Sequence, residues 1–288
     1  MRYGIPWQGS KSRIAEWVVG LLPTSDCLVD LFAGGCAVTH AALLSGKWKR
    51  VIANDTGPGP GMFMEAVRGE FDGFGTVPTR EEFASTDDEV VRLLYSFGSN
   101  RTDYLWSKAI EPLKVEASRM VSASSMHERK RHYAAFMRNL REYLEKNARM
   151  PDADRSHDGD LNGLQGLERL QGLERLDGRG LYDLVCVTRL DYRAVPVPKG
   201  ATVYADPPYR GTNNRGHGDE FDFDAFDAWL SSTDFPVYVS ELTCPRGCVE
   251  VARHERQSSM AANGKSPRVT EKVFVQERFA GIAHGCTG

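Results

Sequence analysis

Short hydrophobic runs alternate with longer mixed segments along most of this chain. Apolar runs at 27–32, 50–54, 184–187, 202–205 and 235–240 have the length and the β-branched content of buried strands. Residues 36–44, which follow a pair of glycines, have the pattern of a helix. A last β-prone segment, 272–275, is placed to form a hairpin with what precedes it. This order predicts an α/β fold whose ligand crevice lies at the carboxyl ends of the strands.

The middle of the chain has a different pattern and looks mainly helical from residue 62 to 150. Thr79 and Glu82 have the spacing of a capping box, which predicts a helix that continues through Leu94. A row of apolar side chains at helical spacing predicts a second helix with this row in a core; the row is Tyr133, Phe136, Met137, Leu140, Tyr143 and Leu144. Between 161 and 178 a leucine repeat of period three predicts a marginal helix or ordered loop without chemistry.

The candidate chemistry lies where the strands end, above all at Asp206, Pro207, Pro208 and Tyr209. The two prolines remove two backbone donors and fix two φ angles, which stiffens the loop. A carboxylate and a carbonyl can accept both hydrogens of an exocyclic amino group while an aromatic face stacks on its ring. The loop therefore suits a heterocyclic amine taken out of a nucleic-acid stack. The alternative is an ordinary Asp-Pro turn with a structural tyrosine.

A second group of strand ends favours a nucleotide-like cofactor. Asp30 and Phe32 close the run 27–32 and are followed by Gly34 and Gly35, so the backbone there can approach a ligand closely. Asp55 ends the next strand, about 20 residues after the glycines, where an acid can hydrogen-bond ribose hydroxyls. The glycines do not form the G-x-G-x-x-G fingerprint, so a pyrophosphate cradle is poorly supported.

In this order, the motifs resemble those of the Dam-like, S-adenosylmethionine-dependent adenine-N6 DNA methyltransferases. The stretches that carry the resemblance are Phe32–Gly35, Asn54–Asp55, Asp206–Tyr209 and Ile5–Lys11, the last being similar to the family's W-x-G-x-K opening. Further similar stretches are Ser96–Asn100, Val239–Glu241 and Thr270–Val275. The order Gly-Gly-Cys-Ala after Ala33 departs from the G-x-G-x spacing of many relatives, which leaves the individual cofactor contacts open.

The resemblance implies a Rossmann-like methyltransferase sheet with helices on both faces and a mainly helical target-recognition insert. Residues 1–60 would form the cofactor half of the methyltransferase domain, 61–160 the insert and 161–288 the catalytic half. The implied partners are S-adenosylmethionine and double-stranded DNA, without a metal, as in DNA methylation by restriction-modification enzymes. The expected cofactor-binding residues are Trp7, Lys11, Asp30, Phe32, Gly34, Asp55, Asp191 and Asp206, and the catalytic residues are Asp206, Pro207, Pro208 and Tyr209.

The implied chemistry is direct. Asp206 and the Pro207 carbonyl would accept both N–H groups of a flipped adenine while Tyr209 stacks on its ring. We expect only the ring face of Tyr209 to be used, and we expect Asp206, at a loop tip, to contribute little to the core.

Several other functions remain open at this point. The main alternatives are methylation of adenine in RNA and a catalytically silent DNA-binding relative. Methylation of cytosine N4 is a further class that shares the architecture, but its enzymes usually carry serine in place of Asp206. Cytosine-C5 chemistry needs a Pro-Cys dipeptide, which the chain lacks. A nucleoside triphosphatase would need the phosphate-binding loop G-x-x-x-x-G-K-[ST], and residues 4–12 are one residue out of register with this motif. Cys244 and Cys248 could hold a metal only with a second ligand pair.

Composition and charge change the picture in two ways. With 288 residues and 41% hydrophobic content the chain can bury one large core and a smaller lobe. Unpatterned cysteines and the lack of a signal peptide or a membrane-spanning run lead us to expect a cytoplasmic protein. We also expect a monomer or weak dimer. The net charge is only −3, but residues 100–149 carry eleven Lys/Arg against six Asp/Glu. This basic excess, densest at His127–His132, predicts phosphate contacts in the insert.

Overall fold

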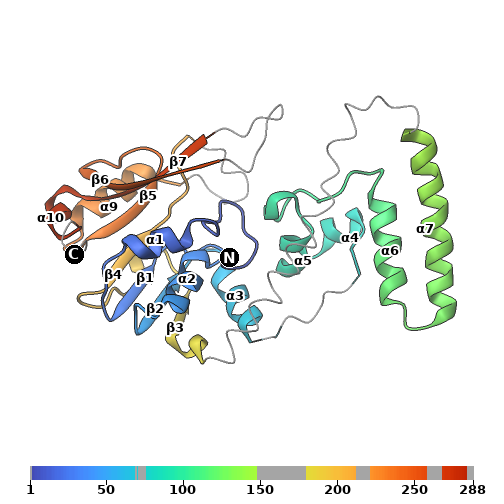
Figure 1. Ribbon diagram of the computed structural model, residues 1–288, viewed down its shortest axis with the longest axis horizontal. Coiled ribbons are helices and arrows are strands. Elements are labelled where there is room, and N and C mark those ends of the chain that lie inside the picture. Colours follow the sequence, from blue (N-terminus) through green and yellow to red (C-terminus); the bar gives the residue numbers. More distant parts are fainter. Residues whose placement is uncertain are drawn as a thin grey trace. The chain divides into compact units, whose positions relative to one another are not determined.

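The computed structural model of the protein describes residues 2–68, 70, 76–147, 180–211, 221–257 and 268–283. The chain forms two compact units (Figure 1). The first unit comprises Met1–Ile5, Gly9–Arg68 and Leu173–Gly288, and the second Pro6–Gln8 and Gly69–Gly172. The leucine repeat at 161–178 lies outside the described residues, and the functional assignment of the three expected segments stays a prediction.

The first unit is built on a seven-stranded sheet with the order β3-β2-β1-β4-β5-β7-β6. The strands are β1 (Cys27–Asp30), β2 (Arg50–Asn54), β3 (Val185–Thr188), β4 (Thr202–Ala205), β5 (Val237–Glu241), β6 (Cys248–Gln257) and β7 (Arg268–Gln276). Strands β1 to β5 are parallel, whereas β7 runs antiparallel between β5 and β6. The predicted α/β sheet and the terminal hairpin are confirmed. From β1 the strand order runs through β2 to β3 on one side and through β4 to β5 on the other. The topological switch point therefore lies between β1 and β4.

Helices cover both faces of this sheet, because neighbouring residues of a strand point to opposite faces. On one face, Thr39 of α2 (Ala37–Ser45) donates a hydrogen bond to Asp30 of β1. On the other face, Phe226 and Leu230 of α9 (Phe223–Ser232) pack with Val29 of the same strand. The remaining helices of this unit are α1 (Ala15–Leu21), α3 (Gly59–Val67), α10 (Ala280–Ala283) and the 3-10 turns η4 (Leu181–Leu184), η5 (Tyr192–Ala194) and η6 (Glu277–Phe279).

The second unit is helical in its described part, as predicted. Its elements are α4 (Arg80–Ser85), α5 (Glu89–Leu94), the 3-10 turn η1 (Phe97–Ser99), α6 (Glu111–Ser122) and α7 (Met126–Asn147). Its small core contains Leu105, Trp106, Ile110 and Leu113, and Phe136 and Leu140 of α7 pack against it. Across the described ranges of both units, no helix is long and apolar enough to cross a membrane.

The single helix predicted from Thr79 to Leu94 is wrong in its length. The capping box is present, since Thr79 accepts from the Glu82 N–H and the Glu82 side chain accepts from the Thr79 N–H. However, the helix ends at Ser85, and Asp88 begins α5 by accepting from the N–H groups of Val90 and Val91. Thr and Asp side chains that bond nearby backbone compete with helical continuation, and this capping divides the segment in two.

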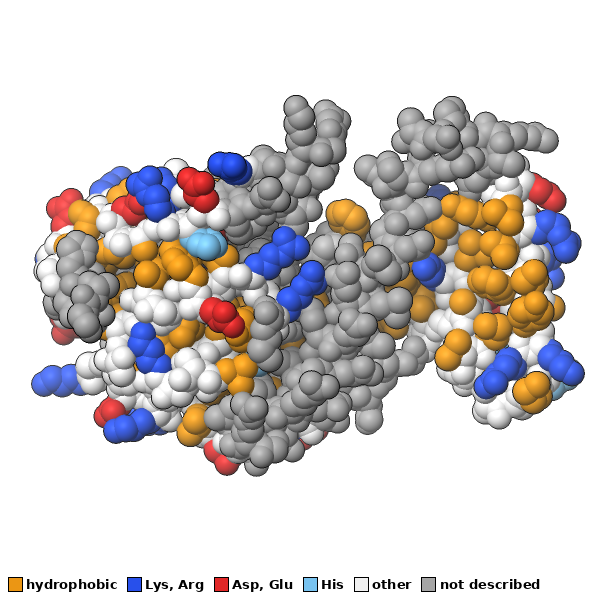
Figure 2. All heavy atoms as spheres, viewed as in Figure 1, with side chains coloured by type: hydrophobic (Ala, Val, Ile, Leu, Met, Phe, Trp, Pro, Cys, Tyr) orange, Lys and Arg blue, Asp and Glu red, His pale blue; other side chains and the backbone are white. Residues whose placement is uncertain are grey.

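The apolar row of α7 is only partly buried, which corrects the prediction that it faces a core. Phe136, Leu140 and Tyr143 pack on the small core, whereas the other three are exposed: Tyr133 (53%), Met137 (38%) and Leu144 (56%). In Figure 2, exposed hydrophobic side chains of this unit lie beside Lys and Arg. Helical spacing correctly identified the apolar side of α7, but the small core of the second unit covers only part of that side.

Candidate active site

Asn54, at the end of β2, ties together the loops that follow three strands. Its amide nitrogen donates to the carbonyls of Leu31 and Leu190, each at 3.0 Å. Its Oδ1 accepts from Thr188 Oγ1 at 2.8 Å and from the Leu190 N–H at 3.0 Å. These bonds use the full capacity of the buried amide and fix the loops after β1 and β3. No role for Asn54 was predicted from the sequence. The pattern that could have indicated one is a polar residue at the end of a buried apolar run.

The glycine turn after β1 is held by Asp55. Asp55 Oδ2 accepts from the Gly34 N–H at 2.8 Å, and Oδ1 accepts from the Gly57 N–H at 2.7 Å. Gly34 (φ +48°) and Cys36 (φ +59°) both have left-handed backbone, which is costly for cysteine and typical of functional turns. The structure therefore brings together Gly34 and Asp55, two of the residues predicted to bind a cofactor.

The N-terminal segment packs directly on this turn. The Ile5 N–H donates to the Gly35 carbonyl at 2.8 Å, and a Cβ on Gly4 (φ +69°) would lie only 2.2 Å from that carbonyl oxygen. Glycine is thus required at position 4 for two reasons, the positive φ and the close approach. This packing holds the start of the chain at the turn that follows β1.

Asp30 is a buried acid with an incomplete set of partners. Its Oδ2 accepts from Thr39 Oγ1 at 2.8 Å, while Oδ1 has no hydrogen-bond partner among the described residues. Burial raises the pKa of Asp30 to about 7, and the nearby carboxylates of Asp206 and Asp55 add to the rise. A buried oxygen without a partner at the switch point is suited to a cationic or hydrogen-bond-donating ligand.

The other predicted cofactor residues have different surroundings. The half-buried Phe32 ring packs in an aromatic cluster, 5.4 Å from Tyr192 and 5.9 Å from Phe226 between ring centres. Asp191, which caps η5 in the loop after β3, is exposed and forms a two-pronged ion pair with Arg193. Trp7 belongs to the second unit, where the Arg101 guanidinium stacks 4.8 Å from its ring centre.

Lys11 joins two residues of the Asp206–Tyr209 loop. Its Nζ lies 2.7 Å from Asp206 Oδ1 and 4.5 Å from the centre of the Tyr209 ring. The side chains of Lys11 and Asp206 are only 7% and 17% exposed. Burial raises the pKa of Asp206 above its usual range, although the Lys11 charge opposes this rise. The expectation that Asp206 contributes little to the core is wrong, because its removal would leave a buried lysine without its ion-pair partner.

The Tyr209 hydroxyl is also engaged, which corrects the expectation that only its ring face is used. It donates to Glu271 Oε2 on β7 at 2.6 Å, and Glu271 is 2% exposed. Burial raises the pKa of the Tyr209 phenol, followed by the effects of the nearby Asp206 and Glu271 carboxylates, so the hydroxyl keeps its proton. Glu271 lies in one of the family-like stretches, but nothing in the sequence connects it with Tyr209.

Arg210 fixes the exit of the same loop. Its N–H donates to Glu241 Oε2 of β5 at 3.2 Å, and its guanidinium pairs with Asp227 of α9 at 2.6 Å. Burial raises the pKa of Glu241, while hydrogen bonds from the Leu242 and Arg210 N–H groups lower it. Arg210 therefore anchors the end of the loop to both β5 and α9.

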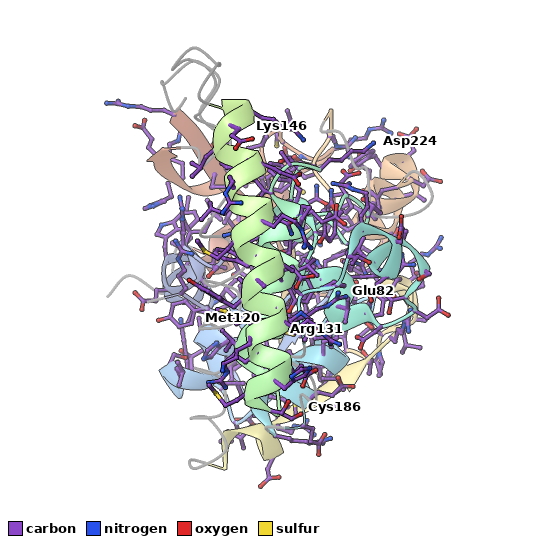
Figure 3. All side chains as sticks on the ribbon, turned by 90° about the vertical axis from the view of Figure 1, so that its right-hand side faces the viewer. Glu82, Met120, Arg131, Lys146, Cys186 and Asp224 are labelled. Atoms are coloured by element: carbon purple, nitrogen blue, oxygen red, sulfur yellow. The ribbon has the colours of Figure 1, made fainter. Side chains whose placement is uncertain are left out.

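The second unit offers exposed positive charge rather than a buried cluster. Arg129, Lys130 and Arg131 of α7 are exposed, and Figure 3 shows this helix along its length with Arg131 and Lys146 labelled. His132, the next residue, is instead held by Glu116 of α6 at 2.8 Å.

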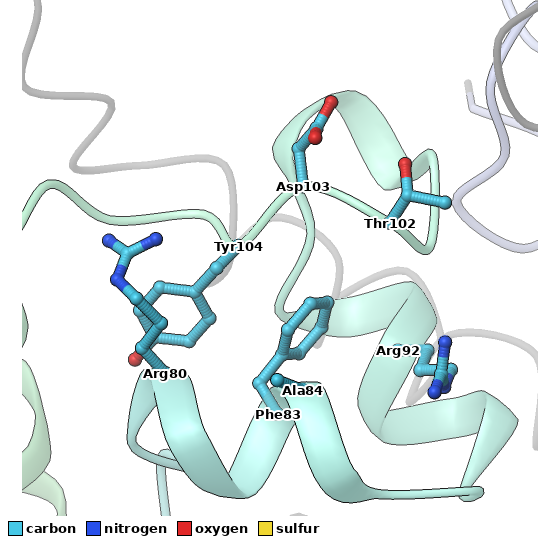
Figure 4. A pocket seen from close by; sticks show the side chains of 7 residues that line it. All are labelled: Arg80, Phe83, Ala84, Arg92, Thr102, Asp103 and Tyr104. Carbon is cyan, nitrogen blue, oxygen red and sulfur yellow. The ribbon is translucent and has the colours of Figure 1, made fainter.

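This unit also has a pocket of about 420 Å³ (Figure 4). It is lined by Arg80, Phe83, Ala84, Arg92, Thr102, Asp103 and Tyr104. Each arginine uses part of its guanidinium on a backbone carbonyl, that of Trp106 for Arg80 and that of Thr86 for Arg92. None of the residues predicted for catalysis or cofactor binding lines this pocket.

In the ranges that the structure describes, no three His, Cys, Asp or Glu side chains gather in a way that could hold a metal ion. Cys244 Sγ instead lies 3.1 Å from the Cys248 carbonyl oxygen, and both thiols are free.

One part of the chain is similar to a known family. Residues 7–88 match the D12 class N6 adenine-specific DNA methyltransferases. The match covers the glycine turn, Asn54 and Asp55, and it ends before the loop of Asp206. A comparison with curated proteins finds no match.

Proposed function

We propose that this chain, whose residues 7–88 match the D12 class N6 adenine-specific DNA methyltransferases, is itself such an enzyme and methylates adenine within a specific sequence of double-stranded DNA. The methyl donor is S-adenosylmethionine, and the adenine is flipped out of the duplex before transfer. The observation that carries the proposal is the contact of Lys11 with both Asp206 and Tyr209 at the switch point of the sheet.

The carboxylates around the switch point fit a cationic cofactor. S-adenosylmethionine supplies an electrophilic methyl on a sulfonium centre, and it also carries an ammonium group and ribose hydroxyls. Asp30, with its unpartnered Oδ1, and Asp55, beside the Gly34 N–H, have the acceptors that such a ligand needs. Phe32 and Asp191 complete the proposed pocket in the first unit, and the role of Trp7 stays a prediction from the sequence.

Asp206 and the Pro207 carbonyl act on the amino group of adenine. The lone pair of this nitrogen is delocalised into the ring, so the amine is a poor nucleophile. By accepting both N–H groups, the carboxylate and the carbonyl favour a pyramidal nitrogen whose lone pair points at the methyl group. Pro207 and Pro208 have no N–H and restricted φ, which holds the acceptors in place. The N–C bond forms as the S–C bond breaks, and the amine then loses one proton.

Lys11 keeps the carboxylate ready for this task. Its charge lowers the pKa of Asp206 against the effect of burial, so the group stays an acceptor. Because Lys11 Nζ occupies Oδ1, we assign the other carboxylate oxygen to the amine. Tyr209 supplies the stacking face for the flipped base, held between Lys11 and Glu271.

The second unit supplies the contacts to DNA. The exposed Arg129, Lys130 and Arg131 on α7 provide solvated charge suited to phosphate groups. We further propose that the protein acts as a monomer or weak dimer.

The test is transfer of a labelled methyl group from S-adenosylmethionine to duplex DNA, followed by digestion and identification of the labelled nucleoside. The expected product is N6-methyladenine in DNA. Label in N4-methylcytosine would overturn the choice of base, and label in RNA alone would overturn the choice of polymer. If no label is transferred to either polymer while S-adenosylmethionine binds, the chain is the silent relative.

A further inference from the structure

We propose that Glu271 is a positioning residue for methyl transfer, which acts by holding the hydroxyl of Tyr209 and so setting the angle of its ring. The inference rests on the proposed function, in which this ring stacks on the flipped adenine. Neither the family match, which ends at residue 88, nor the catalytic loop itself contains Glu271.

The topology of the sheet explains why an acid far along the chain reaches this loop. Strand β7 runs antiparallel to β5, so its first residues lie at the edge where the parallel strands end. Lys272 pairs with Glu241, the last residue of β5, and Glu271 lies one residue further toward the loops. The antiparallel strand thus delivers its amino end to the carboxyl edge of β4 and β5, where Asp206–Tyr209 begins.

The side chain of Glu271 points into the protein. Glu271 shares a face of β7 with the fully buried Val273 and Val275, and it is itself 2% exposed. A buried carboxylate is costly unless it is hydrogen-bonded, so its bond of 2.6 Å with the Tyr209 hydroxyl holds the tyrosine firmly. The phenol stays protonated as the donor, and the carboxylate is the acceptor.

Three of the contacts around Tyr209 restrain its ring. Lys11 lies over the ring, Glu271 holds its hydroxyl, and Arg210, the next residue, is bonded to Glu241 and Asp227. The Glu271 bond opposes rotation of the ring about its Cα–Cβ and Cβ–Cγ bonds, whereas Lys11 lies over the ring face. A tilted ring would misplace the stacked base relative to Asp206, and small misplacements reduce the rate of transfer strongly.

The test is a double-mutant cycle with single-turnover methyl transfer at saturating DNA and cofactor. Glu271→Ala should lower the rate roughly 10- to 100-fold, the scale of a hydrogen bond to a charged group. Glu271→Gln, which can still accept from the phenol, should recover a large part of that loss. Binding of S-adenosylmethionine, measured by calorimetry, should be the same in all variants, because Glu271 acts on the Tyr209 ring that stacks on the adenine and not on the cofactor.

The decisive arm is the Tyr209→Phe background, in which there is no hydroxyl to hold. There, Glu271→Ala should cause little further loss, because both changes break the same hydrogen bond. An equal loss in both backgrounds would show that Glu271 supports the strand and not the ring, and would overturn the inference. So would a Glu271→Ala enzyme with the wild-type rate.

Melting temperatures identify variants that fail to fold. If Glu271→Ala is among them, Glu271→Leu completes the same cycle, because leucine fills the buried space but cannot accept from the phenol. Failure of the proposed function is recognised separately, since the wild-type protein would then form no N6-methyladenine at all.

Discussion

The charged side chains around the Asp206–Tyr209 loop of the first unit and those along α7 of the second unit have opposite surroundings. In the first unit Lys11, Asp30, Glu241 and Glu271 are all less than 9% exposed, and Lys11 and Glu271 are bonded directly to the catalytic loop. In the second unit the basic side chains of α7 are exposed. Buried charges act at fixed positions in a medium of low dielectric, whereas exposed charges are screened by salt. We therefore expect substitutions of the buried charges to change the rate of methyl transfer, and substitutions of the exposed charges on α7 to change the affinity for DNA.

The largest effect is expected at Asp206. Asp206→Asn keeps the shape of the side chain but offers an amide nitrogen where the carboxylate accepted, so methyl transfer should fall by roughly a hundredfold or more. Asn is preferable to Ala because it keeps a polar partner beside the buried Lys11. The check is transfer of labelled methyl to duplex DNA, with the melting temperature as the control for folding. A variant of full activity would remove Asp206 from the mechanism.

Asp55 should have the next largest effect, on the cofactor. Asp55→Ala should weaken binding of S-adenosylmethionine by about 1–3 kcal/mol, because it removes ribose hydrogen bonds and loosens the Gly34 turn. Isothermal calorimetry without DNA measures this directly. Asp26→Ala is the matched control, because Asp26 is an exposed acid of the first unit that is paired with Lys49 and has no assigned role in the site. Unchanged affinity in Asp55→Ala would exclude Asp55 from the cofactor site.

The basic cluster of α7 should affect DNA alone. Replacing Arg129, Lys130 and Arg131 by Gln should raise KM for DNA and reduce the slope of log affinity against log salt by about one unit for each phosphate that is no longer bound. The matched control replaces Lys49, Lys199 and Arg246, which are exposed cations of the first unit. If both triple variants show the wild-type salt slope, α7 is only a solvated surface.

The smallest expected effect is a shift in pH dependence. Transfer needs the ionised form of Asp206, so activity is lost as pH falls through the pKa of this group. Burial raises that pKa, and the charge of Lys11 lowers it. Lys11→Met should therefore move the acid limb of the kcat profile to higher pH. An acid limb that stays in place would mean that Lys11 does not control the ionisation of Asp206.

The sheet and its strand ends could be predicted from the sequence because buried strands of a parallel sheet are continuous apolar runs. The pairings between distant segments, such as Lys11 with Asp206 or Tyr209 with Glu271, could not be predicted, because they depend on where the strands lie in the sheet. The exposed half of the α7 row was missed for a related reason. Periodicity identifies an apolar side of a helix but not the width of the surface that covers it.

The measurement that tests the proposed mechanism most directly is the single-turnover rate of methyl transfer at saturating duplex DNA, compared between Asp206→Asn and the α7 triple variant. The Asp206→Asn rate should be lower by roughly a hundredfold or more at every salt concentration. The triple variant should remain within about twofold of the wild-type rate, because its phosphate contacts contribute to affinity and are satisfied at saturation. Equal reductions in the two variants would contradict the division between a buried site for chemistry and an exposed helix for DNA.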